Sequence, residues 1–319
     1  MALKLGRKAV FFTFTACVFL SLLIFSSNVG NNYEMRQKSF VLETRIDSMN
    51  NFISDVENDV EKAIYIAGFR SLIGLEEHIV STGEYLSDLD ANFSELFFNG
   101  TINGVNSSFM VNNTFTDWMD RIEDEADKID IIINFSIQNT SLSQDNPWEV
   151  RIDMDLIIDV VDKKDVCRWN KNKSITAHIE IAGFEDPIYR LGTNGMFENR
   201  IEKTNFSYFV SGTNIDNLLN HTYSGYYTEF SGAPSYLMRL QGDFGESEYG
   251  IESLVDIDEL VSMGISIKQK TIVDYLYFGT ENPPRQSVSG APSWFRLDNR
   301  SNMDNSQGHY DLYEVIGLV

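Results

Sequence analysis

The feature that most constrains this chain is an apolar run near its N-terminus. Residues Ala9–Tyr33 carry no charged side chain, and Ala9–Phe25 (AVFFTFTACVFLSLLIF), called the apolar run below, is almost wholly apolar. A helix over residues 9–27 rises about 1.5 Å per residue and so approaches the roughly 30 Å of a bilayer's hydrocarbon layer. The pattern predicts a transmembrane signal anchor over residues 9–27.

The charges that flank the run predict its orientation. Lys4, Arg7 and Lys8 precede it directly, and positive residues are retained on the cytoplasmic side. We therefore expect residues 1–8 to form a cytoplasmic stub, with the chain in the cell membrane as a single-pass protein and its body extracellular. The alternative is a cleaved secretory signal, which would also export the body, although Phe25-Ser26-Ser27 matches a cleavage site poorly.

Charge and cysteine content exclude some functions. The 319 residues include 47 acidic and 25 basic side chains, a formal net charge of −22, and three of the bases precede the apolar run. Such an acidic body repels phosphate backbones, so no nucleic-acid partner is expected. The two cysteines are Cys17, in the run, and Cys167, so no disulfide can form within the body.

Asparagine acceptor triplets agree with an extracellular body. The chain has ten Asn-x-Ser/Thr sites, where its composition would give about four by chance. We predict a glycoprotein that is modified at these asparagines: Asn92, Asn99, Asn106, Asn112, Asn134, Asn139, Asn172, Asn205, Asn220 and Asn299.

A heptad stripe predicts a long helix after the run. A flexible joint is expected over Ser26–Asn32, followed by a helix over about 33–80, so that residues 28–83 form one unit. Apolar residues then alternate at spacings of three and four, which predicts an amphipathic helix. The stripe serves either as an internal packing spine or as a homo-oligomeric coiled coil, and its residues are the candidate assembly surface: Leu42, Ile46, Met49, Ile53, Val56, Val60, Ala63 and Ala67.

The remaining chain reads as a loop followed by a β-rich body. Residues 84–115 are polar and hold four acceptor sites, which predicts an exposed loop. Residues 116–319 are expected to form the extracellular β-rich domain, beginning with a short helix over about 116–129. Apolar residues alternate over 131–137, 150–161 and 175–181, and further strands are predicted over 206–210, 223–230, 265–278 and 310–316. The predicted fold class is α+β, with the long helix packed on antiparallel strands.

No motif predicts catalysis or a cofactor. The sequence contains neither a phosphate-binding loop nor a nucleophile elbow, and its four histidines are isolated. Asp153, Asp155 and Asp159 share one face of a strand, where they form either a calcium site or, as we favour, the solvated side of a half-buried strand. The protein is therefore predicted not to be an enzyme, with no metal or cofactor.

Aromatic residues offer a candidate binding surface. A tyrosine-rich region and two similar corners, Ala233-Pro234-Ser235-Tyr236 and Ala291-Pro292-Ser293-Trp294, have the composition of adaptable contact surfaces. The alternative function is therefore an extracellular ligand-binding or adhesin module that uses these residues: Tyr223, Tyr226, Tyr227, Tyr236 and Trp294.

The order of segments resembles a known architecture. A short basic N-terminus, an apolar span, a heptad helix and a β-rich body with many acceptor sites are similar to archaeal type IV pilin-like and related single-pass envelope proteins. The resemblance covers mainly residues 1–80. It implies a structural or assembly protein of the cell surface, whose partners are the membrane and either further copies of the chain or other envelope and filament proteins.

Overall fold

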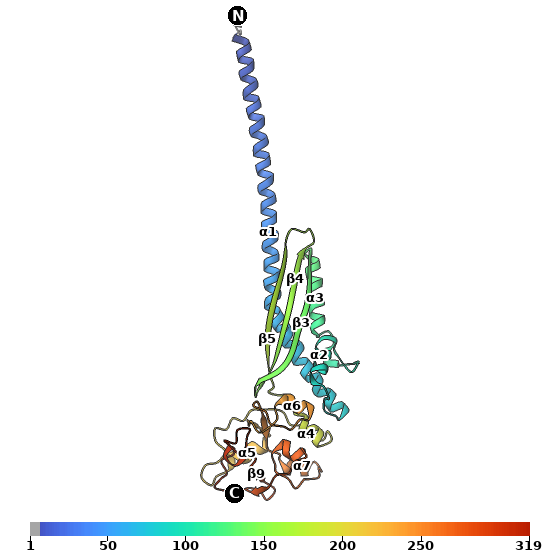
Figure 1. Ribbon diagram of the computed structural model, residues 1–319, viewed down its shortest axis with the longest axis vertical. Coiled ribbons are helices and arrows are strands. Elements are labelled where there is room, and N and C mark those ends of the chain that lie inside the picture. The colour runs from blue at the N-terminus through green and yellow to red at the C-terminus, as the bar shows by residue number, and fades with distance from the viewer. Residues whose placement is uncertain (1–6) are drawn as a thin grey trace.

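One continuous helix extends from the N-terminal end of the described chain into the folded body (Figure 1). The computed structural model describes residues 7–319, with side chains described for residues 11–26 and 36–319. Helix α1 (Arg7–Thr82) has 76 residues, which corresponds to about 114 Å. Its N-terminal part projects away from the rest of the chain, and its C-terminal part is packed into the body.

The predicted transmembrane helix is wrong. Among the residues that the structure describes, no helix combines the length and apolar character that are needed to cross a membrane. Of the predicted anchor, residues 9–27, the side chains of residues 11–26 are described, while Ala9, Val10 and Ser27 lie outside the described side chains. The helix itself does not end with the run, because α1 continues into a charged segment.

The joint expected over Ser26–Asn32 is also wrong. These residues are helical, and α1 passes through them without interruption. The prediction relied on the local preference of Ser, Asn and Gly for turns, which amounts to less than about 1 kcal/mol per residue and is a weak guide within a long helix.

A three-stranded antiparallel sheet covers one side of α1. Strands β3 (Ile131–Asn146), β4 (Glu149–Asp162) and β5 (Arg168–Glu180) follow the order β3-β4-β5. Every second residue of β4 is buried, from Val150 to Val160, as the alternation predicts. The apolar face of the sheet packs against α1 and against α3 (Phe115–Lys128), and the polar face is open.

The heptad stripe of α1 divides into two parts. Six of its residues, from Met49 to Ala67, are at most 8% exposed within their own body. These six cannot contact another copy without opening the core, so the interpretation of the stripe as an internal spine is correct for them, and their assignment to an assembly surface is wrong. Leu42 and Ile46 precede the body and are 45% and 37% exposed.

The segment predicted as an exposed loop, 84–115, is folded. It contains α2 (Leu89–Asn99), the hairpin of β1 (Thr101–Ile102) and β2 (Val105–Asn106), and the 3₁₀ turn η1 (Ser108–Met110). Phe93 and Phe97 of α2 are buried, and Phe97 stacks on Phe115. Aromatic residues spaced four apart outweigh the polar composition that favoured a loop.

Helix α3 begins one residue before its predicted start. Thr114 is the N-cap: its hydroxyl accepts a hydrogen bond from the Asp117 amide, and Asp117 accepts one from the Thr114 amide. This reciprocal pair is a capping box, which fixes where the helix starts. Trp118 of α3 stacks on Phe115 and packs against Phe135 of β3.

The C-terminal part, residues 181–319, is not β-rich as predicted. Its described segments are short, because apolar residues here occur in brief clusters instead of long alternating runs. Only a part of the predicted strand 223–230 is extended, and residues of 265–278 and 310–316 form helices instead. The elements are α4 (Pro187–Gly192), α5 (Asp216–Tyr223), β6 (Tyr227–Glu229), α6 (Tyr236–Gln241), β7 (Ile251–Ser253), α7 (Ile257–Ser262), α8 (Asp274–Phe278), β8 (Arg285–Ser287), β9 (Arg296–Asp298) and α9 (His309–Leu312).

Gly68 sets how closely α1 approaches the sheet. A Cβ atom at this position would lie 2.2 Å from Cδ1 of Ile152 and 2.9 Å from Cδ1 of Ile179. We expect Gly68→Ala to destabilise the body by about 1–3 kcal/mol through overpacking, although alanine is the better helix former. Chemical denaturation of the full chain measures the change. The control is Asn58→Ala at an exposed position of the same helix, and a Gly68→Ala chain as stable as that control would refute the tight contact.

Candidate functional site

The apolar run is the largest exposed apolar surface among the described side chains. Its ten large apolar residues from Phe11 to Phe25 are 41–71% exposed. Soluble proteins rarely leave so much apolar area in water unless a partner covers it. The run is therefore the first candidate for an interaction surface.

The run has no polar side. Successive residues of a helix are separated by about 100°, and at this spacing the widest angular gap between its large apolar side chains is about 80°. A single partner helix covers only one side of such a cylinder. The run therefore requires cover from several directions.

Arg45 marks the point where α1 enters the body. Its guanidinium pairs with Asp162 at 2.7 Å and donates to the Asp130 carbonyl at 2.8 Å, so it joins α1 to the end of β4 and to the turn between α3 and β3. Residues 7–44 precede this contact and correspond to about 57 Å of helix. The run is thus held well away from the body.

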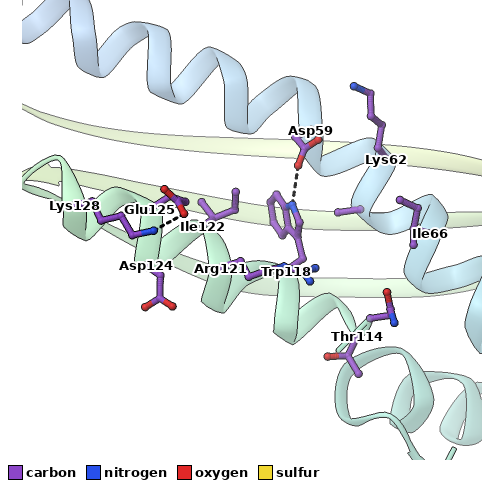
Figure 2. A pocket seen from close by; sticks show the side chains of 12 residues that line it. Asp59, Lys62, Ile66, Thr114, Trp118, Arg121, Ile122, Asp124, Glu125 and Lys128 are labelled. Atoms are coloured by element: carbon purple, nitrogen blue, oxygen red, sulfur yellow. Dashed lines mark hydrogen bonds and ion pairs between the residues drawn. The ribbon is translucent and has the colours of Figure 1, made fainter. Parts of the chain in front are cut away.

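A first groove lies between α1 and α3. It has a volume of about 490 Å³, and at its floor Trp118 Nε1 donates to Asp59 at 3.0 Å (Figure 2). Lys128 pairs with Glu125 at its edge. Its acidic and basic side chains are balanced, so the groove has no strong preference for a charged ligand.

A second groove of about 470 Å³ lies between α1 and the turn at residues 182–185. Phe69 and Phe184 line it, with their ring centroids 5.3 Å apart. Glu76 is buried at its base, where it accepts a hydrogen bond from the Tyr236 hydroxyl at 2.6 Å. Burial raises the pKa of Glu76 to about 8, against the opposing effect of the Tyr236 bond.

The predicted tyrosine-rich surface is only partly present. Tyr227 and Tyr236 are fully buried and donate to Asp186 and Glu76, so their assignment to a surface is wrong. Tyr223 is exposed and Tyr226 and Trp294 are half-buried. Tyr223 lies edge-on to Trp294 at a centroid distance of 6.3 Å.

The two similar corners fold differently. Ser235 caps α6, and Tyr236 then enters the core. The second corner leads into β9 and leaves Trp294 half-buried, with an indole N–H that has no partner. The same local sequence thus lies in two different environments. Of the predicted binding surface, only Tyr223, Tyr226 and Trp294 remain accessible.

Nine of the ten acceptor asparagines are exposed, from Asn99 to Asn299. Asn134, Asn139 and Asn172 lie on the open face of the sheet. Asn92 is the exception: it is 8% exposed within α2, and its predicted modification is incompatible with the folded chain. Glycosylation at the other nine stays a prediction.

The three aspartates of β4 are engaged across the sheet. Asp153 accepts from Thr176, Asp155 from Ser174 at 2.6 Å, and Asp159 pairs with Arg168 at 2.7 Å. Among the described residues, no cluster of His, Cys, Asp and Glu has the arrangement of a metal site. These carboxylates therefore serve the solvated face of the strand.

Two buried ionic clusters hold the C-terminal part together, and no sequence pattern indicated them. Arg239 is fully buried between Asp186 and Asp274, at 2.6 and 2.8 Å. His309 lies between Asp298 and Glu252, at 2.9 and 3.2 Å. Burial opposes the charge of His309, but Glu252 and Asp298 outweigh it and raise its pKa to about 10.

These clusters have the character of structural supports. The grooves described above do not reach Arg239 or His309. Removing one partner of such a buried pair leaves an uncompensated charge, at a cost of about 3–5 kcal/mol. Their chemistry therefore fixes the conformation of the C-terminal part and presents no reacting group to a ligand.

Comparison with known proteins adds no further identification. The chain matches no protein family, no curated protein and no solved structure.

The buried carboxyl of Glu76 makes a pH test possible. Its pKa is about 8 in the folded chain against 4.5 for an ordinary glutamate, so native stability falls as pH rises from about 4.5 to about 8. Glu76→Gln removes the titration and retains an oxygen that can accept from Tyr236. We expect the variant to match the native chain near pH 4 and to exceed it in stability at pH 9.

Thermal or chemical unfolding at both pH values measures this difference. The control is Glu77→Gln at the exposed neighbouring position. If Glu76→Gln and the native chain keep the same stability difference at pH 4 and pH 9, the carboxyl is not held neutral by burial.

Proposed function

We propose that this protein is a structural component of the cell surface that assembles with further copies of itself through the apolar run. The observation that carries the proposal is the exposure of the run on a helix that projects from a well-packed body. Burial of each large apolar side chain contributes about 1.5–3 kcal/mol. Ten such residues supply more than enough to overcome the entropic cost of association.

The shape of the run supports an assembly of several copies. Because its apolar residues point in all directions, a pair of helices would leave much of each run in water. A bundle of parallel or staggered helices covers each run on every side. The polar, sequon-bearing face of the sheet then remains outside, which agrees with a location at the cell exterior.

The assembly surface proposed here differs from the heptad stripe. Of that stripe, only Leu42 and Ile46 are sufficiently exposed to contact a neighbour. The run and Leu42 lie on the free part of α1 that precedes Arg45, and Ile46 follows Arg45 directly. Association through this part leaves the body unchanged.

A double substitution in the run tests the proposal. Phe19→Glu with Ile24→Glu places charges on two sides of the helix, about 140° apart. We expect the native full chain, after removal of detergent, to sediment as assemblies larger than a dimer. The variant should lose at least about 100-fold in affinity, since two buried side chains are worth about 3 kcal/mol or more.

Sedimentation velocity measures the assemblies, and circular dichroism with thermal unfolding checks that the body is intact. Val105→Asp, at a 69% exposed apolar position on the body, is the matched control and should assemble normally. A native chain that stays monomeric at micromolar concentration would refute self-assembly. So would a chain that phosphatidylcholine vesicles take up as a monomer, because lipid would then cover the run.

A further inference from the structure

The outer face of α1 carries a second apolar surface, which we call the outer stripe. It consists of residues spaced three, four or seven apart on the side of α1 that faces away from the sheet: Tyr65, Ile66, Phe69, Ile73 and Val80. Tyr65, Ile66 and Val80 are 36–49% exposed, and the other two are half-buried. Phe109 of η1 lies at the same groove and is also exposed.

From this we infer that the outer stripe of one copy receives the apolar run of a second copy. The inference rests on the proposed function and names the surface that the run meets. Both surfaces are helical. The large apolar side chains of the run are exposed, and those of the stripe are covered only in part, since Phe69 packs on Phe184 whereas Tyr65, Ile66 and Val80 are exposed. They are too far apart on one straight helix to meet each other, so contact between them joins two molecules.

The two surfaces match in length. The described part of the run, Phe11–Phe25, has 15 residues and the stripe, Tyr65–Val80, has 16, which correspond to about 22 and 24 Å of helix. The second groove lies along the stripe, and Phe69, Phe109 and Phe184 line it. Aromatic side chains such as those of the run can enter a groove of this size.

Their flanking charges are complementary. The sequence places Lys4, Arg7 and Lys8 directly before the run. Acidic residues outnumber basic ones along the stripe, because positions 59–84 hold Asp59, Glu61, Glu76, Glu77 and Glu84 against Lys62 and Arg70. Attraction between these groups favours the run over another apolar segment that lacks a basic flank. The contact is heterologous, because it joins two different surfaces, and such contacts can add copies without limit.

Cysteine chemistry tests the contact directly. Cys17 is exposed in the middle of the run, and end-to-end overlap with the stripe brings it beside position 73 in either helix direction. On one helix, positions 17 and 73 are about 84 Å apart, so a disulfide between them must join two copies. We therefore combine Ile73→Cys with Cys167→Ser and oxidise the assembled full chain with copper phenanthroline.

The expected result is a cross-linked species in which mass spectrometry finds the Cys17 peptide joined to the peptide that contains position 73. Ser141→Cys, on the open face of the sheet, is the matched control and should give at least tenfold less of such a product. Cross-links that join only Cys17 to Cys17 would overturn the inference, since the run would then meet another run. Assemblies that form without any cross-link to position 73 would also overturn it.

A second variant separates this inference from the proposed function. Ile66→Asp changes a half-exposed side chain, so the body should fold normally while assembly weakens at least tenfold. If Phe19→Glu with Ile24→Glu abolishes assembly but Ile66→Asp does not, self-assembly stands and the outer stripe is not its receptor. If the run variant assembles like the native chain, the proposed function itself is wrong.

Discussion

The packing of one face of α1 on the sheet is the constraint on which the rest of the structure depends. Residues from Met49 to Ala67 fill the space between the sheet, α3 and α2, and Gly68 allows the helix to approach Ile152 and Ile179 closely. This contact fixes the axis of a helix that continues far beyond the body. The direction of the free part of α1, and hence the position of the apolar run, follows from that packing.

Periodicity made part of this fold predictable. The alternation in β4 and the heptad spacing in α1 reflect burial on one face, and both elements occur where these patterns place them. Periodicity shows that a face is covered but not by what. The heptad stripe was therefore also compatible with a partner helix, and only the burial of Met49 and its successors assigns most of it to the body.

Other parts were hidden from sequence reasoning for physical reasons. The C-terminal part is held by Arg239 and His309, whose acidic partners lie 11 to 57 residues away, so no local pattern indicates them. The polar composition of residues 84–115 concealed the aromatic face of α2. The spacing of Ile66, Phe69 and Ile73 is visible in the sequence, but it does not show that Phe69 and Ile73 are half-buried against the body while Ile66 stays exposed.

Opposing forces act on any assembly of this chain. The hydrophobic effect, which favours burial of the runs and outer stripes, acts only at short range, so it favours close contact between helices. The part of the chain after the run holds all 47 acidic residues and all but three of the 25 bases, so the bodies repel one another. Salt screens that repulsion over about 8–10 Å but leaves the apolar contacts in place. A helix that separates the run from the body by tens of ångströms reconciles the two forces, because the run of one copy can reach the apolar surface of the next while the two charged bodies remain apart.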